Sequence, residues 1–225
     1  MSGAALTLYT YWRSSAACRV RIGLNLKGLP WEAKPVHLVR DGGQQHGPGY
    51  AALNPQQLVP TLVHGQTVLT QSLAILEYLD EAFPYTAALL PNDAAGRARV
   101  RALAQLVACD IHPVNNLRVM QYLGGTLGVD DAARQEWTTH WMETGFAAME
   151  SMLAGSAQTG RFCHGDTPGL ADCCLVSQLY NARRFNVDLA PYPTLVGIEQ
   201  TCLAMPAFVA AMPAAQGDAD MPPVS

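Results

Sequence analysis

The sequence predicts two domains of different class, an α/β domain followed by an all-α domain. Up to about residue 84, short strand-like runs alternate with amphipathic segments of helix length, which is typical of a mixed sheet covered by helices. The stretch "FPYTAALLPND" then has the prolines and small residues of a linker. From residue 92 onward strand patterns nearly vanish. We therefore place an α/β domain at residues 1–84 and an all-helical domain at residues 92–225.

The chain begins with a strand, a helix and a second strand. The run "LTLYTYW" alternates as a strand does, and a helix is predicted from Ser15 to Lys27. Gly28 ends this helix, because a residue without Cβ suits a helix C-terminus. The run "PWEAKPVHL" predicts the next strand, and the polar, glycine-rich "VRDGGQQHGPG" predicts a surface loop.

A hairpin and a helix complete the first domain. The runs "TLVH" and "TVLT" flank a turn at His64-Gly65-Gln66, which favours an antiparallel hairpin. Ser72 is a candidate N-cap for a helix that carries Leu73, Leu76 and Leu79 on one face. The order β-α-β, loop, β-β-α predicts a thioredoxin-like sheet of about four strands.

The second domain is predicted to hold about four to six helices. Asp93 is a candidate cap for the first of them, and Pro113 should kink a long helical stretch. The stretch "GDTPGLAD" predicts a capping box with Gly169 at the cap and Asp172 three residues later. The tail "PAAQGDADMPPVS" is expected to fray. Helix-length apolar periodicity covers residues 96–122, 132–153, 170–184 and 194–204.

Composition excludes several function classes. The 225 residues are 49% hydrophobic and 14% charged, with a net charge of −4 and no basic cluster, so neither nucleic acid nor a membrane surface is an expected partner. No segment reaches the roughly 18 apolar residues of a spanning helix, and a cytoplasmic location is expected. The six cysteines form no Cys-x-x-Cys pair, which predicts reduced and mostly buried thiols and no metal site.

Several separated motifs together resemble the zeta class of the soluble glutathione transferases, which includes the maleylacetoacetate and maleylpyruvate isomerases. They are "YWRSSAACRVRIGLNLKG", "LNPQQLVPTL", "QSLAILEYLDE", "CDIHPVNNLRV" and "GDTPGLADCCLVSQLYNARRFNVDLAPYPT". The resemblance spans nearly the whole chain. It implies the glutathione transferase fold, glutathione as cofactor, and a homodimer whose interface is formed partly by the long helix from Gly96 onward.

The turn after the first strand raises the question of the nucleophile, because Ser15-Ala16-Ala17-Cys18 stands where a thioredoxin-type protein has Cys-x-x-Cys. The resemblance implies that the nucleophile is the thiolate of bound glutathione. Ser14 would stabilise that thiolate together with the helix dipole, and Ser15 would be its backup. Cys18 is expected to face the core. Without the other motifs, both serines would be ordinary capping residues.

The resemblance also implies glutathione contacts. Val59 would pair with the cysteinyl segment if Pro60 is cis, although sequence alone favours an ordinary trans proline at a strand start. Gln71 and Ser72 would hold the glutamyl carboxylate at a helix start. His112 and Asn116 are candidates for contact with glutathione or substrate, but a neighbouring residue would equally satisfy such a histidine.

Three arginines are candidates for binding a dicarboxylic keto-acid substrate. Arg13 lies beside Ser14, Arg184 matches the substrate-carboxylate residue of the family, and Arg118 matches a basic position of bacterial maleylpyruvate isomerases. Each would otherwise be a solvated surface charge. The predicted activity is reversible thiolate addition that isomerises maleylpyruvate or maleylacetoacetate to the fumaryl product in the degradation of aromatic compounds. The choice between these substrates stays open, and a general conjugating or dehalogenating transferase and a non-catalytic protein of the same fold are the alternatives.

Overall fold

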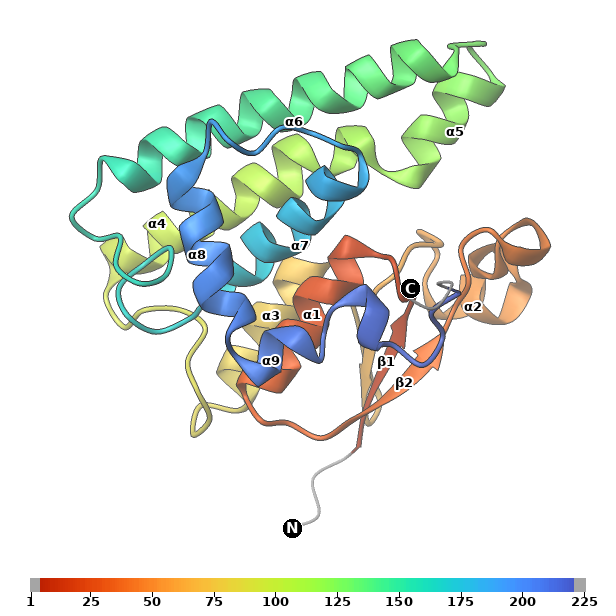
Figure 1. Cartoon of the computed structure of the whole chain (residues 1–225). Coiled ribbons are helices and arrows are strands. Elements are labelled where there is room, and N and C mark those ends of the chain that lie inside the picture. Colours follow the sequence, from red (N-terminus) through yellow and green to blue (C-terminus); the bar gives the residue numbers. More distant parts are fainter. Residues whose placement is uncertain (1–4, 221–225) are drawn as a thin grey trace. The chain divides into compact units, whose positions relative to one another are not determined.

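The computed structural model describes residues 5–220, which fall into two compact units (Figure 1). The first unit contains residues 5–89 together with residues 204–220, and the second contains residues 90–203. The sequence had placed residues 204–220 with the helical domain. Their contacts instead group them with the α/β unit.

The first unit is built on a four-stranded mixed sheet with the strand order β2-β1-β3-β4. Strand β1 pairs with β2 in parallel and with β3 antiparallel, and β3 and β4 form a hairpin through Gly65, which has a φ of 60°. A sheet of four strands that includes this hairpin is what the alternation of elements predicted. The strands are β1 (Leu6–Thr10), β2 (Trp31–Pro35), β3 (Thr61–His64) and β4 (Thr67–Thr70).

Helices of the first unit begin and end largely where local signals predicted. Helix α1 (Ser15–Leu26) has Ser14 as its N-cap, and Gly28 follows it with a φ of 63°. Helix α3 (Ser72–Ala82) follows the hairpin. The remaining helices of this unit are α2 (Pro48–Leu53) and the short α9 (Pro206–Val209).

The stretch predicted as a surface loop is more ordered than expected. It contains 3-10 turns at Arg40–Gly42 and Gln44–His46, and α2 begins at Pro48 directly after it. Proline fits the first helical position because its missing N–H has no partner there in any case. Such short pieces carry too few residues for a periodic pattern, so no local signal predicts them.

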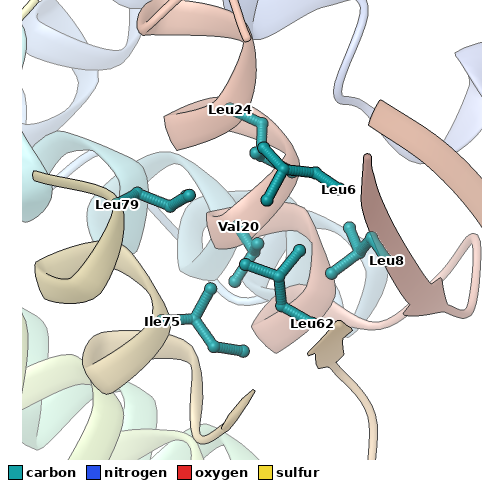
Figure 2. Close-up of a cluster of buried hydrophobic side chains, with 7 residues drawn as sticks. All are labelled: Leu6, Leu8, Val20, Leu24, Leu62, Ile75 and Leu79. Atoms are coloured by element: carbon teal, nitrogen blue, oxygen red, sulfur yellow. The ribbon is translucent and has the colours of Figure 1, made fainter. Parts of the chain in front are cut away.

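The sheet and two helices enclose an apolar core. Side chains from β1 and β3 meet side chains from α1 and α3 in one cluster, as Figure 2 shows. Alternation in β1 and the three- and four-residue spacing in the helices direct these side chains inward. The cluster fixes both helices, and therefore their N-termini, against the sheet. Its members are Leu6, Leu8, Val20, Leu24, Leu62, Ile75 and Leu79.

The predicted frayed tail is wrong for residues 213–220, whereas residues 221–225 lie outside the described part of the chain. A 3-10 turn forms at Pro213–Ala215, and the Asp218 carboxylate accepts a hydrogen bond from the backbone N–H of Trp12 at 3.0 Å. Asp220 accepts from Arg40 at 2.9 Å and contacts the His37 ring at the same distance. Contacts this distant in sequence leave no local signal, and the polar composition alone suggested disorder.

The second unit is helical, as predicted, but its first long window is not one helix. Helix α4 passes into a π-helical turn at Leu106–Ile111, followed by a 3-10 turn at Pro113–Asn115 before α5 begins. The kink predicted at Pro113 is therefore confirmed. The Asp93 carboxylate accepts a hydrogen bond from Gly96 N–H at 2.8 Å and caps α4. The helices are α4 (Ala94–Gln105), α5 (Leu117–Gly125), α6 (Asp131–Ala154), α7 (Leu170–Arg184) and α8 (Pro193–Leu203).

Asp172 fixes the start of the central helix α7. Its carboxylate accepts Gly169 N–H at 2.8 Å, which is the half of the predicted capping box that a glycine cap permits, and it also accepts Cys163 N–H at 2.8 Å. Burial raises the pKa of this carboxyl, while the two backbone donors act in the opposite direction. The side chain therefore joins the loop before α7 to the helix itself.

Replacing Asp172 with alanine is expected to destabilise the protein by about 2–4 kcal/mol, because two buried N–H groups lose a carboxylate acceptor. Urea unfolding followed by circular dichroism measures the loss. Asp166→Ala is the matched control, since the exposed Asp166 accepts one N–H, from Arg161, in the same loop. An equal loss for both variants would contradict the role given to Asp172.

Candidate active site

Three loops emerge side by side at one edge of the sheet. The β-strand register places Tyr9 opposite Thr61, and Thr61 opposite Thr70, so the C-terminal ends of β1 and β4 flank the start of β3. The segment leading to Ser14 follows β1, Val59 and Pro60 precede β3, and Gln71 and Ser72 follow β4. Sheet topology therefore gathers the candidate residues of the first unit at a single edge.

Ser14 presents a hydroxyl at the positive end of α1. Its Oγ accepts a hydrogen bond from Ala17 N–H at 3.2 Å, which uses a lone pair and leaves the O–H to donate elsewhere. Ser14 is half-buried, whereas Ser15 is buried as the first helical residue. The Arg13 guanidinium lies 5.3 Å from the centre of the Trp12 ring. A donor hydroxyl at a helix N-terminus favours an anion such as a thiolate.

The segment before Ser14 is held by a residue that the sequence reasoning missed. Arg21 is fully buried, and its guanidinium donates to Thr10 Oγ1 at 2.9 Å, to Trp12 O at 3.0 Å and to Ala211 O at 2.9 Å. Burial lowers its pKa. Asp218 accepts the Trp12 N–H and Arg21 donates to the Trp12 C=O, so both backbone polar groups of Trp12 are held in place. Arginines within the otherwise apolar run "CRVRIGL" were the signal in the sequence that could have indicated a buried charged residue here.

Cys18 is not placed to act as a nucleophile. The thiol is 2% exposed and its Sγ donates to Ala211 O at 3.5 Å. Burial raises its pKa, against smaller opposite effects of Arg21 and Arg19. A buried thiol with a raised pKa is mostly protonated and unreactive. The expectation that Cys18 faces the core is confirmed. The six cysteines, all within the described residues, form no disulfide; five of them are buried and Cys109 is exposed.

The Val59–Pro60 peptide bond is cis, as the family resemblance implied. Tyr50 donates its hydroxyl to Leu58 O at 2.6 Å, and the Asn54 amide donates to the same carbonyl at 2.8 Å. Within residues 5–220, the backbone N–H and C=O of Val59 form no hydrogen bond. These two backbone groups of Val59 can therefore pair with an extended peptide, as strand addition requires.

The start of α3 departs from the prediction that Ser72 is its cap. The N-cap is Gln71, with a φ of 68° and no capping hydrogen bond from its side chain, and Ser72 is the first helical residue. The Gln71 amide donates instead to Gln56 at 2.9 Å, while Ser72 Oγ accepts from the buried Arg19 at 3.3 Å. The first N–H groups of α3 have no side-chain cap, which makes this helix start suited to a carboxylate.

Three candidates of the second unit lie around the Pro113 kink. Asn116 caps α5, because its side chain accepts a hydrogen bond from Val119 N–H at 3.2 Å. Its side-chain carbonyl therefore has a structural task, and only its amide N–H groups remain as donors to a ligand. His112 is half-buried at the end of the π-helical turn, and Arg118 is exposed on the first turn of α5.

Two adjacent arginines at the end of α7 have different environments. The Arg183 guanidinium donates to the Glu199 carboxylate, which is buried. The Arg184 guanidinium lies 4.4 Å from the centre of the Phe185 ring and is exposed. Contact with an aromatic ring covers one face of a guanidinium and limits its motion, and a guanidinium suits a carboxylate because its planar fork can donate two parallel hydrogen bonds.

Within the described residues 5–220, no group of three or more His, Cys, Asp and Glu side chains is arranged to hold a metal ion. No helix in the same part of the chain is long and apolar enough to cross a membrane.

Comparison with known proteins identifies the family to which this chain belongs. Residues 8–88 match the family model of the glutathione S-transferase N-terminal domain. A maleylpyruvate isomerase from Ralstonia sp. is 52% identical over 214 residues, which are 95% of this chain and 99% of the relative. The chain therefore belongs to the glutathione transferases.

Solved structures narrow the class further. The holo structure of a maleylpyruvate isomerase, a bacterial zeta-class glutathione transferase, is 52% identical with a TM-score of 0.91, covering 95% of this chain and 99% of that one. A maleylacetoacetate isomerase from Anaeromyxobacter dehalogenans, solved with bound glutathione, is 45% identical with a TM-score of 0.85, covering 97% and 100%. Within the superfamily, the zeta-class isomerases are thus the family of this chain.

Proposed function

We propose that this protein is a glutathione-dependent cis-trans isomerase that converts maleylpyruvate or maleylacetoacetate to the fumaryl isomer. The observation that carries the proposal is the gathering of Ser14, Val59 and Ser72 at one sheet edge, each with the group that a part of glutathione requires. The high identity to isomerases over nearly the full chain supports the same activity.

The residues present fit the glutamyl and cysteinyl parts of glutathione. The uncapped start of α3, with Ser72, suits the γ-glutamyl carboxylate, and the unpaired backbone of Val59 suits the cysteinyl segment. The Ser14 hydroxyl and the α1 dipole suit the thiolate. Bound glutathione supplies a thiolate that adds reversibly to the maleyl double bond, so that the bond can rotate before elimination restores it in the trans form.

Fixed cations are assigned to the substrate. Arg184 binds a substrate carboxylate, and Arg13, beside Ser14, stabilises the negative charge that develops on the substrate as sulfur adds. Arg118, exposed on α5 and matching a basic position of bacterial maleylpyruvate isomerases, favours maleylpyruvate over maleylacetoacetate. His112 and the Asn116 amide contribute further polar contacts to glutathione, and Ser15 assists Ser14.

We assign the protein to aromatic catabolism in the cytoplasm, as a homodimer whose interface includes α4. Both assignments rest on the resemblance of the chain to the zeta-class isomerases. Size-exclusion chromatography with light scattering measures the dimer directly. A monomer at micromolar concentration would contradict this part of the proposal.

A general conjugating transferase is the second candidate, because it would use the same three features of the first unit. It would not require arginines placed for a dicarboxylate. Conjugation of a neutral electrophile such as 1-chloro-2,4-dinitrobenzene therefore separates the two activities.

The test is the ultraviolet absorbance of maleylpyruvate and, separately, maleylacetoacetate mixed with purified protein, with and without glutathione. The expected result is fumaryl product that forms only with glutathione, and the better substrate names the reaction. Tight glutathione binding without turnover of either keto acid would contradict the isomerase and favour the conjugating transferase.

A further inference from the structure

Arg19 is a buried cation directly behind the start of α3. Its side chain, on α1, is 1% exposed, and its Nη1 donates a hydrogen bond to Ser72 Oγ at 3.3 Å. The two residues are 53 positions apart, so the tertiary fold alone brings them together.

The hydrogen bond from Arg19 determines in which direction the Ser72 hydroxyl can donate. A guanidinium has only donors, so the serine oxygen must accept, and its own O–H is left to donate to another group. A serine at this position without such a donor is free to turn its O–H toward other acceptors. Arg19 therefore prepares Ser72 as a donor, which is the role that an incoming carboxylate needs.

The other donors at the start of α3 also favour a bound carboxylate. Ser72 begins α3, whose first turn has no side-chain cap, and the helix dipole places partial positive charge there. Arginine remains protonated in proteins, and a charge in a buried setting is screened less than one in water. A fixed cation, an oriented hydroxyl and backbone N–H groups thus share one end of the helix.

We propose that Arg19 is a positioning residue for the γ-glutamyl carboxylate of glutathione and acts through Ser72. The inference rests on the proposed function, because it assumes that glutathione is the ligand of this edge. Arg19 need not touch glutathione. Its effect is to hold the Ser72 donor in place and to add positive charge behind it.

The test compares two ligands by calorimetry with the full-length protein. One is glutathione, and the other is 4-aminobutyryl-cysteinylglycine, which keeps the amine and lacks the γ-glutamyl carboxylate. Arg19→Gln is expected to weaken glutathione binding about 10- to 100-fold, in the range of a charge-assisted hydrogen bond, and to change the affinity of the analogue less than about threefold. In turnover, the KM for glutathione should rise more than kcat falls.

Two further variants separate a specific effect on glutathione binding from a general loss of stability. Lys27→Met removes another buried cation of the first unit, which binds Asp80 at 3.1 Å and Ala87 O at 2.9 Å, and it should lower the melting temperature without changing either affinity. Arg19→Lys keeps the charge and a donor, and it should recover part of the glutathione affinity. If Arg19→Gln does not fold, the affinities of Arg19→Lys for the two ligands provide the test instead.

Equal losses for both ligands in the Arg19 variants, or no loss for glutathione, would overturn the inference while leaving the isomerase proposal intact. A wild-type protein that does not bind glutathione would overturn the proposed function itself. In the Ser72→Ala background, Arg19→Gln should produce a smaller loss than in the wild-type background, because the hydroxyl that Arg19 orients is gone and only the effect of its charge remains.

Discussion

Ser14→Ala should lower kcat/KM for the preferred maleyl keto acid by about 10²- to 10³-fold, the loss typical of removing one donor from a developing or bound anion. The reason is that Ser14 keeps its O–H for the thiolate, since its cap bond uses only a lone pair. The pKa of the thiol of bound glutathione should also rise in this variant. Thiolate absorbance followed against pH measures that change.

The loss of a helix cap needs a separate control, because Ser14→Ala also costs α1 about 1 kcal/mol of capping. Asp93→Ala removes a comparable cap, the one that accepts Gly96 N–H at the start of α4. It should lower stability similarly and leave turnover within about threefold. If Ser14→Ala lost no more activity than Asp93→Ala, the hydroxyl would be a cap and nothing more.

The parts of the fold that sequence predicted correctly depend on local signals. Ser14 and Asp93 cap helices in the structure as their positions before apolar segments indicated, and Gly28 has the positive φ that a helix end favours. The hairpin of β3 and β4 follows from two short apolar runs around a glycine turn. Each of these depends on residues within a few positions of one another.

The parts that sequence did not predict depend on contacts across the chain. Asp218 binds Trp12 N–H over 206 positions, and Arg21 binds Ala211 O over 190. The tail therefore supports the segment that carries Ser14. An acidic, glycine-containing tail has the composition of a disordered one, so composition predicted the opposite.

Ser72 shows the same limit at the level of a single residue. Its position before an apolar run correctly indicated a helix start, but the cap is Gln71 in a left-handed conformation. The hydroxyl that would have closed the helix end instead accepts a bond from Arg19. Sequence located the site, while the orientation of its donors required the packing of α1 against α3.

Arg184→Ala should raise the KM for the maleyl keto acid about 10- to 100-fold, the range of a charge-assisted hydrogen bond to a carboxylate, and leave glutathione affinity nearly unchanged. The guanidinium lies 4.4 Å from the centre of the Phe185 ring, and this contact limits its motion. Initial rates at varied keto acid and at varied glutathione separate the two constants. Equal weakening of both would contradict its assignment to the substrate.

Arg183→Ala is the matched control, because it removes the same chemistry one residue away. Arg183 pairs with the buried Glu199, whose pKa burial raises and the Arg183 hydrogen bond lowers. Losing this partner leaves a buried carboxylate without its cation, so the variant should unfold at lower temperature while its KM for the keto acid stays within about threefold. If Arg183→Ala instead raised KM as much as Arg184→Ala, the substrate carboxylate would be bound by the end of α7 as a whole and not by the arginine that stacks on Phe185.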